Sequence, residues 1–296
     1  MAAKSKITYQ TFDENFYLQK YPDVAAAVQS GGFESGWQHY LEFGFREKRR
    51  IGISDRQSVL PQDVLPPSPP DDLVERIGGV RNINNYHYVG KNVAHTLKNT
   101  LTTELIVLHP QDKILDFGCG CGRVISWLQQ LCPEYRYYGT DIDSSAIKWC
   151  QNNLADIAQF SVNPHLPVSS YQDNYFDLIY SISVFTHLPE EMQFAWLAEL
   201  SRITKPGGYL LLTTHDEALF PFASGKEKQQ LDRQGFYFLR EQSTPGLPDF
   251  YQTTFHSRSY IYHLWQKYFE IKTIVEQGVL DHQDIVVCQK RVLSIT

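Results

Sequence analysis

The stretch Ile114-Leu115-Asp116-Phe117-Gly118-Cys119-Gly120-Cys121-Gly122-Arg123 decides the fold of this 296-residue chain. An apolar strand over residues 113–117 runs into three alternating glycines, and a helical pattern follows over 124–131. Glycine lacks a Cβ atom, so the backbone can turn sharply there and a ligand can lie against it. The free N–H groups at the start of the next helix then point at that ligand. The order strand, glycine turn and helix therefore predicts a ligand-binding loop.

The spacing of the glycines distinguishes between two kinds of ligand. A dinucleotide fingerprint needs Gly-x-Gly-x-x-Gly, whereas here the third glycine comes one residue early and Arg123 stands in its place. This spacing suits a ligand without a pyrophosphate. Asp141 follows the next expected strand, 19 residues after Gly122, and a carboxylate there can accept both ribose hydroxyls of a nucleoside. The alternative role for Asp141 is that of a helix N-cap.

The segments around this loop alternate between strand and helix patterns. The hydrophobic periodicity predicts helices over 124–131, 144–154 and 190–203, and strands over 113–117, 135–140, 159–162, 176–181 and 209–214. Residues 206–208 form a Pro-Gly-Gly turn, and 269–276 with 284–289 have the pattern of a closing hairpin. This rhythm predicts an α/β fold with a doubly wound parallel sheet and right-handed crossovers. The hairpin adds one antiparallel strand.

A cluster of prolines divides the chain. Five of its 15 prolines lie between Pro61 and Pro70, where they fix φ and remove hydrogen-bond donors. We therefore expect a small helical module over 1–55, a Pro-rich linker over 56–80 and a main domain over 81–296 with a cap insertion at 216–268. The module has helical patterns after Asp13, from Pro22, and after Gly31-Gly32.

Composition narrows the possible partners and the location. The formal net charge is −6, without the basic excess of proteins that neutralise nucleic-acid phosphates, so we expect no nucleic-acid partner. The N-terminus has no apolar signal core and no window approaches 18 apolar residues, so a cytoplasmic protein without a membrane span is expected. Cys119 and Cys121 have no second Cys/His pair at zinc spacing, so no metal site is expected.

Four segments resemble class I S-adenosylmethionine-dependent methyltransferases. Residues 116–122 (Asp-Phe-Gly-Cys-Gly-Cys-Gly) match the family's first motif, and residues 138–143 (Tyr-Gly-Thr-Asp-Ile-Asp) match the second. Residues 175–188 resemble the fourth-strand segment, and residues 200–212 resemble the Leu-Lys-Pro-Gly-Gly turn with the fifth strand. The resemblance implies a Rossmann-like seven-stranded sheet of order 3-2-1-4-5-7-6, with strand 7 antiparallel. It also implies S-adenosyl-L-methionine as the cofactor.

The same resemblance implies a set of cofactor-binding residues. These are Asp116, Gly118, Cys119, Gly120, Asp141, Ile142, Asn163 and Ser181. Asn163 departs from the family pattern, which often has an acid there to contact the adenine amino group. An amide can still bond the adenine edge, and the alternative is an Asn-Pro turn without a ligand.

The module is similar to a short helical unit found beside bacterial glycosyltransferases. This favours a bacterial protein of secondary or surface-glycan metabolism, with a possible protein partner for the module.

The long segment between the fifth and sixth strands is interpreted as a cap over the methyl acceptor. Residues 216–268 hold 12 aromatic side chains, and the alternative is that they only extend the core. A hydroxyl acceptor favours a nearby base, and the candidate catalytic residues are His215, His256 and His187.

The expected reaction is O-methylation of a small molecule, a sugar, or a glycan or secondary-metabolite precursor. The alternatives are N-methylation of a small molecule or peptide, and a cofactor-binding adaptor without turnover. A nicotinamide dehydrogenase is disfavoured by the glycine spacing.

Overall fold

The computed structural model describes residues 12–33, 35–44, 49, 52–53, 65–78, 81–167, 169–215, 225–240, 248–280 and 283–292. The chain divides into two compact units. The smaller unit comprises residues 1–63 with 218–229, and the larger comprises 64–217 with 230–296.

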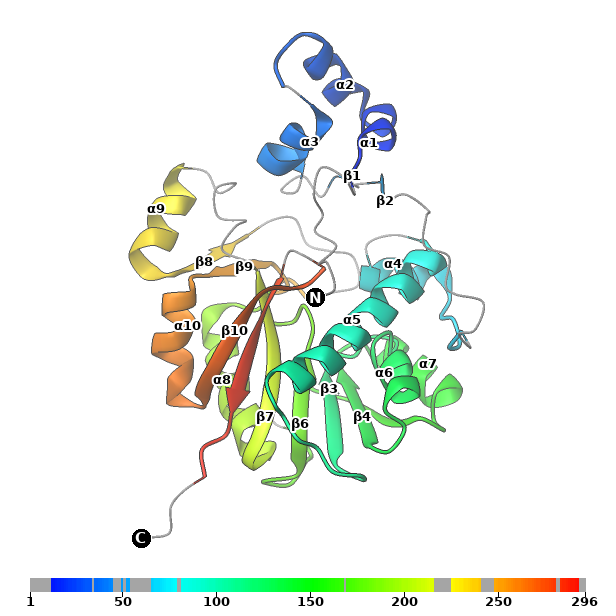
Figure 1. The fold of residues 1–296 in the computed structure, drawn as a ribbon, viewed down its shortest axis with the longest axis vertical. Coiled ribbons are helices and arrows are strands. Elements are labelled where there is room, and N and C mark those ends of the chain that lie inside the picture. The colour runs from blue at the N-terminus through cyan, green and yellow to red at the C-terminus, as the bar shows by residue number, and fades with distance from the viewer. Residues whose placement is uncertain are drawn as a thin grey trace. The chain divides into compact units, whose positions relative to one another are not determined.

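A seven-stranded sheet forms the centre of the larger unit (Figure 1). In chain order its strands are β3 (Lys113–Phe117), β4 (Arg136–Asp141), β5 (Ala158–Val162), β6 (Phe176–Ser181), β7 (Thr204–His215), β10 (Glu270–Val279) and β11 (Gln283–Gln289). Their spatial order is β10-β11-β7-β6-β3-β4-β5. β11 runs antiparallel to both neighbours, while β4, β3, β6 and β7 pair in parallel. Numbered one to seven and read from the β5 edge, this is the predicted order 3-2-1-4-5-7-6, which confirms the fold class.

Helices cover both faces of this sheet. They are α4 (Asp71–Gly78), α5 (Ile83–Thr103), α6 (Ile125–Leu131), α7 (Ser144–Asn153), α8 (Glu190–Ile203), α10 (Arg258–Leu264) and the 3-10 turn η3 (Trp265–Lys267). Figure 1 shows α5 and α6 on one face and α8 on the other. Between β7 and α10 lie α9 (Gly225–Gln234) and a two-stranded hairpin of β8 (Phe236–Leu239) and β9 (Thr253–His256).

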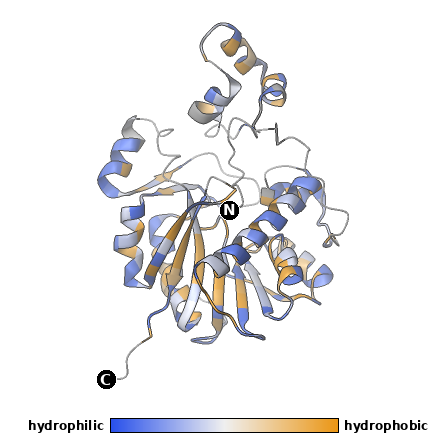
Figure 2. Cartoon of the chain, viewed as in Figure 1, coloured by the Kyte–Doolittle hydropathy of each residue, from blue (hydrophilic) through white to orange (hydrophobic). Residues whose placement is uncertain are grey.

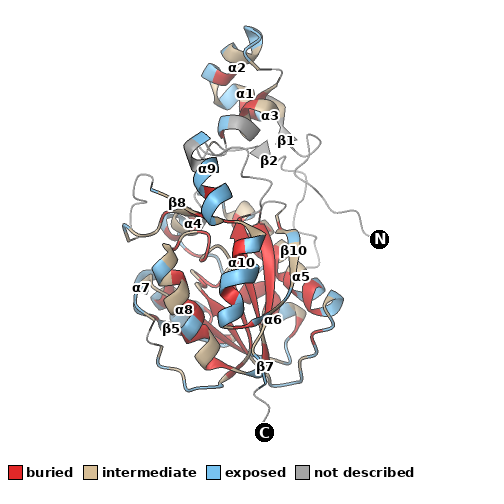
Figure 3. Cartoon of the chain, turned by 90° about the vertical axis from the view of Figure 1, so that its left-hand side faces the viewer, coloured by how far each residue is buried: buried red, intermediate tan, exposed pale blue. Residues whose placement is uncertain are grey.

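The core lies in the central strands because their side chains are apolar on both faces of the sheet. Leu115, Ile179, Leu210 and Val286 come from four different strands, and each is at most 1% exposed. Figure 2 shows the apolar strands and Figure 3 their burial beneath helices with exposed outer faces. This buried sheet holds the carboxyl ends of β3, β4 and β6 at one edge, where open α/β sheets bind ligands.

Several segments differ from the sequence prediction, and two of them are β7 and α4. β7 begins at Thr204 rather than at residue 209. The Pro-Gly-Gly residues lie within the strand, where they shift the register of its pairing with β6 between Phe176 and Leu178. Gly207 has φ +80° there, which its lack of a Cβ permits. The second difference is α4, a helix within the predicted linker. Its first turn carries Asp71 and Asp72, which suit a helix N-terminus, and Leu73 and Val74 are buried.

The smaller unit contains the helical pattern predicted for the module. Its helices are α1 (Glu14–Lys20), α2 (Pro22–Gln29) and α3 (Gly36–His39), and the π-helical turn η1 (Tyr40–Gly44) follows. Two short strands, β1 (Phe12–Asp13) and β2 (Gly52–Ile53), pair antiparallel. The Glu14 carboxylate accepts the backbone N–H groups of Gly36 and Trp37, so it joins α1 to the start of α3.

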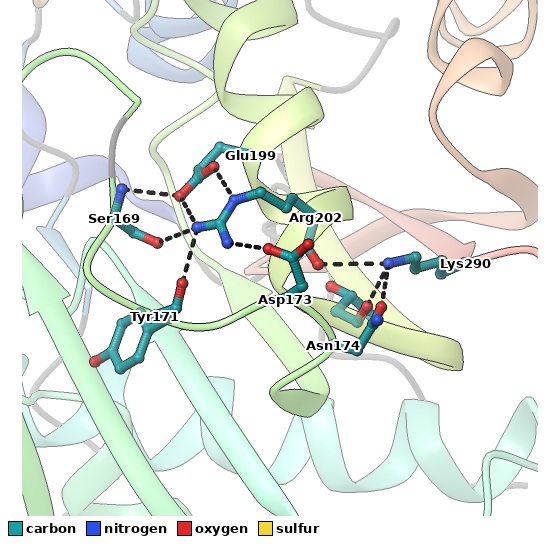
Figure 4. Close-up of polar contacts among 8 residues, drawn as sticks. Ser169, Tyr171, Asp173, Asn174, Glu199, Arg202 and Lys290 are labelled. Carbon is teal, nitrogen blue, oxygen red and sulfur yellow. Dashed lines mark hydrogen bonds and ion pairs between the residues drawn. The ribbon is translucent and has the colours of Figure 1, made fainter.

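An arginine fastens the loop between β5 and β6 to α8 (Figure 4). The Arg202 guanidinium donates to both carboxylate oxygens of Glu199, to Asp173 and to the carbonyl of Tyr171. Glu199 is only 8% exposed and also accepts the backbone N–H of Ser169. Because Glu199 is buried, removal of its cation leaves an uncompensated charge.

We therefore expect Arg202→Met to destabilise the protein by about 1–3 kcal/mol, since a buried acceptor loses its partner. Denaturant unfolding monitored by circular dichroism measures this. The double variant Arg202→Met/Glu199→Gln should recover part of the loss, because the buried charge is then gone. A loss that the double variant does not reduce at all would contradict a role for this ion pair.

Candidate functional site

The glycine loop after β3 has the backbone geometry that its sequence predicts. Gly118, Gly120 and Gly122 have φ values of +83°, +52° and +67°, a region that L side chains rarely adopt. A Cβ atom on Gly118 would lie 2.2 Å from Cγ2 of Val184 in the segment after β6. The loop therefore needs glycine for its conformation and for its close approach to that segment.

Asp141 joins the glycine loop to the end of β4. Its Oδ2 accepts the backbone N–H of Gly120 at 2.8 Å, and its Oδ1 accepts that of Asp143 at 2.8 Å. The N-cap of α7 is Asp143, whose Oδ1 accepts the N–H groups of Ser145 and Ala146. The N-cap role considered for Asp141 thus belongs to Asp143. Each Asp141 oxygen keeps a second lone pair for a ligand.

A pocket opens above this loop at the carboxyl edge of the sheet. Seven of the eight predicted cofactor residues line it, namely Asp116, Gly118, Cys119, Gly120, Asp141, Ile142 and Asn163. Further lining side chains come from the end of the glycine loop, from α4, from the segment after β6, from α8 and from the segment before β9, among them Arg76, Ile77, Arg123, Ser183, Val184, Leu188, Met192, Trp196, Phe250 and Tyr251. The pocket therefore combines a polar loop with apolar walls, as a nucleoside ligand requires.

Asp116 is the deepest acid of the pocket. It is 2% exposed, and the Tyr180 hydroxyl donates to its Oδ2 at 3.0 Å. Burial raises the pKa of this carboxyl to about 8, against the opposing effect of the Tyr180 hydrogen bond. No ion pair of this carboxylate is found in the described part of the chain. A buried acid of this kind is suited to a cationic group of a ligand.

Asn163 carries an unpaired acceptor at the far end of the pocket. The residue is 7% exposed, and its Nδ2 donates to the carbonyl of Pro164 at 3.1 Å. Its Oδ1 is buried and has no hydrogen-bond partner, a condition that costs about 1–3 kcal/mol unless a ligand relieves it. An amino group such as that of adenine would supply the missing donor.

Ser181, the eighth predicted residue, does not line the pocket. Its side chain is 0% exposed, and its hydroxyl donates to the carbonyl of Phe117 at 2.9 Å, which ties β6 to β3. Ser183, two residues on, lines the pocket instead, with φ +59°. Its hydroxyl accepts from Nε2 of Gln283 at 2.6 Å. Ser181, at the end of β6, points toward β3 inside the sheet. The turn after β6 brings Ser183 to the pocket wall.

His187 and His215 lie at the carboxyl ends of β6 and β7, with ring centroids 6.4 Å apart. Each holds the segment around β9, because Nδ1 of His187 bonds the carbonyl of Gln252 and Nδ1 of His215 that of Thr254, both at 2.7 Å. A carbonyl only accepts, so Nδ1 carries the proton and the neutral ring has its lone pair on Nε2. Neither ring lines the pocket, but His187 stacks at 4.1 Å on Tyr251, which does.

His256 lies farther from the pocket. It is 1% exposed among Phe236, Tyr260 and Trp265, and its Nε2 bonds Oε1 of Gln193 at 2.8 Å. Burial lowers the pKa of His256 to about 3, so the ring stays neutral. This environment is that of a core histidine. The sequence did not reveal it, because the aromatic residues around His256 were interpreted as a cap over the acceptor rather than as core.

The sequence did not predict several of the lining residues. Arg76 and Ile77 lie on α4 within the predicted linker, and Arg76 pairs with Asp143. Arg123 was noted only as the residue that replaces a glycine. The sequence contained a signal for α4, since acidic residues precede the apolar pair Leu73-Val74. The neighbouring prolines led instead to the prediction of a linker.

Comparison with known proteins agrees with this geometry. Residues 115–212, from β3 to β7, match the model of the methyltransferase domain family. The chain contains a class I methyltransferase domain. The cofactor of this domain is S-adenosylmethionine. The match includes the glycine loop, Asp141, Asn163 and the turn with Ser183.

Curated relatives match part of this chain. A malonyl-[acyl-carrier protein] O-methyltransferase of Hahella chejuensis is 33% identical over 108 residues, which are 36% of this chain and 37% of that one. A phthiotriol/phenolphthiotriol dimycocerosates methyltransferase of Mycobacterium ulcerans is 30% identical over 152 residues, 49% of each chain. The chain thus spans half or less of the length of these two relatives.

A solved S-adenosylmethionine-dependent methyltransferase from Methanosarcina mazei aligns with a TM-score of 0.46 and 22% identity, covering 62% of this chain and 95% of that one. In the described ranges, no helix of the methyltransferase domain or the smaller unit is long and apolar enough to cross a membrane. Those ranges also hold no cluster of three or more metal-ligating side chains.

Proposed function

We propose that this chain transfers the methyl group of S-adenosylmethionine to a hydroxyl of a small molecule, such as a sugar or a secondary-metabolite precursor. The observation that carries the cofactor part is the distribution of polar groups along one pocket. Asp116 offers a buried carboxyl group that an ammonium ion would help to ionise, Asp141 offers two acceptor oxygens, and Asn163 a buried acceptor without a partner. These match the ammonium, the ribose hydroxyls and the adenine amino group of the cofactor, in that order from β3 to β5.

When bound, the sulfonium supplies a reactive methyl group, so the protein mainly aligns an in-line displacement. The apolar walls of the pocket would exclude water from this position. A hydroxyl acceptor must lose its proton as its oxygen attacks. A neutral His187 or His215 ring that is protonated on Nδ1 could accept this proton on Nε2. His256 has no part in this proposal because it lies in the core.

Replacement of His187 or His215 tests the acceptor half of the proposal. If one of them is the base, its change to Gln should slow methyl transfer by roughly 10²–10⁴-fold. The assay follows transfer from methyl-labelled S-adenosylmethionine into a metabolite fraction that accepts the label. His256→Gln is the matched control.

Two alternatives give different results in the same assay. An amine acceptor attacks through its own lone pair, so both variants would keep their activity and the pH profile would follow the amine. A cofactor-binding adaptor would bind S-adenosylmethionine but transfer no label to any fraction.

A further inference from the structure

Arg123 is a half-buried cation that the cofactor contacts proposed above leave unused. It follows the third glycine of the loop, and its side chain lines the pocket. Its Nε is buried without a hydrogen-bond partner, and within the described ranges its guanidinium forms no ion pair. A buried guanidinium nitrogen rarely stays without a hydrogen-bond partner, because its desolvation is then uncompensated.

The surroundings of Arg123 fix where its side chain runs. Its stem lies against Gly90 in the middle of α5, where an added Cβ would be 3.0 Å from Cγ of Arg123 and 2.4 Å from its carbonyl oxygen. The guanidinium carbon lies 5.9 Å from the ring centroid of Tyr86, and the Tyr86 hydroxyl donates to the carbonyl of Cys121 at 3.0 Å. The glycine explains how α5 approaches the loop so closely, and the fixed ring supports the guanidinium.

The other cation of the pocket behaves differently. Arg76 also lines it, but its guanidinium is paired with Asp143, which caps α7. Asp116 and Arg123 both line the pocket, yet no hydrogen bond or ion pair between them is found among the described residues. Burial raises the pKa of Asp116 to about 8 in the free protein, and an ammonium group beside it would favour the ionised carboxylate. An ionised Asp116 and the Arg123 guanidinium together are the complement of an α-amino acid zwitterion.

We propose that the Arg123 guanidinium binds the carboxylate of the cofactor's methionine group, while Asp116 faces its ammonium. This inference rests on the proposed cofactor and adds a specificity determinant to it. A guanidinium suits the position because its planar fork matches a carboxylate. Without the carboxylate, ligand binding would leave this cation buried and unpaired. The pocket should therefore discriminate strongly between cofactor forms with and without that group.

The test compares two probes by titration calorimetry. One is S-adenosylhomocysteine, and the other is its decarboxylated form, which keeps the amino group. The unchanged protein should bind the decarboxylated probe about 10- to 100-fold more weakly, the range expected for hydrogen bonds to a charged group. Arg123→Met should lose a similar factor for S-adenosylhomocysteine and bind both probes alike. Arg123→Lys should fall between, since it keeps the charge without the fork.

Arg76→Met is the matched control, because it removes a pocket arginine that already has a protein partner. It should leave the ratio between the two probes unchanged. Thermal melting checks that each variant is folded, and the probe comparison on the unchanged protein decides the question even if Arg123→Met does not fold. Equal affinity of the unchanged protein for both probes would overturn the assignment of Arg123. So would an equal loss for both probes in Arg123→Met. Failure of the unchanged protein to bind S-adenosylhomocysteine at all would instead overturn the proposed function.

Discussion

Asp141→Ala should weaken S-adenosylmethionine binding by about 100-fold or more. The carboxylate has two tasks, since it would accept the ribose hydroxyls and it already holds the N–H groups of Gly120 and Asp143. Each charge-assisted hydrogen bond contributes about 1.5–3 kcal/mol, and loss of the loop contacts adds to the loss of the ribose contacts. Calorimetric titration of the variant measures the sum.

A deoxyribose probe separates these two tasks. The unchanged protein should bind S-adenosylhomocysteine more tightly than its 2′-deoxy form, and Asp141→Ala should lose that difference because the acceptor is absent. Asp143→Ala is the control for the loop, since it removes the cap of α7 but not the ribose acceptor. If Asp141→Ala still discriminates between the two probes as the unchanged protein does, the ribose assignment is wrong.

Asp116→Asn should stabilise the free protein and at the same time impair cofactor binding. The pKa of Asp116 is raised from 3.8 to about 8 by burial. Below pH 3.8 the carboxyl is protonated in both the folded and the unfolded chain, so it contributes no pH dependence there. Between this pH and about 8 the unfolded chain ionises while the folded chain keeps its proton, so stability falls as the pH rises.

The amide cannot ionise, so the variant lacks this loss of stability. Its melting temperature should exceed that of the unchanged protein by roughly 5–10 °C at pH 8, with a smaller gap at pH 5. Its affinity for S-adenosylhomocysteine should fall, because the ammonium loses its counter-charge, while 5′-methylthioadenosine, which lacks the amino acid, should bind as before. A variant that is less stable than the unchanged protein at pH 8 would contradict the buried-acid account.

The strand pattern could be predicted because each strand is bounded by strong local signals. β6 and α8 have the predicted bounds, since an apolar run ends at the turn after Ser181 and Pro189 precedes an amphipathic helix. α5 was missed although Tyr86, Val93, Leu97 and Leu101 bury one helical face. Polar residues separate these positions, and no glycine loop or strand marks the start of the helix.

The cofactor loop was predicted more fully than the acceptor side for a physical reason. The positions of Gly118, Gly120 and Asp141 depend on contacts between neighbouring strands, which short motifs encode. The roles of His187, His215 and His256 depend on which carbonyl or aromatic side chain of the cap segment lies beside each ring. Those contacts join residues 20 to 65 positions apart, so no local pattern distinguishes a core histidine from one at the strand ends.

Titration of the unchanged protein with S-adenosylmethionine, and in parallel with NAD, tests the central claim most directly. The account predicts saturable one-to-one binding of S-adenosylmethionine, competition by S-adenosylhomocysteine, and no heat of binding with NAD. Binding of NAD in the same pocket, or no binding of S-adenosylmethionine at millimolar concentration to the folded protein, would contradict it.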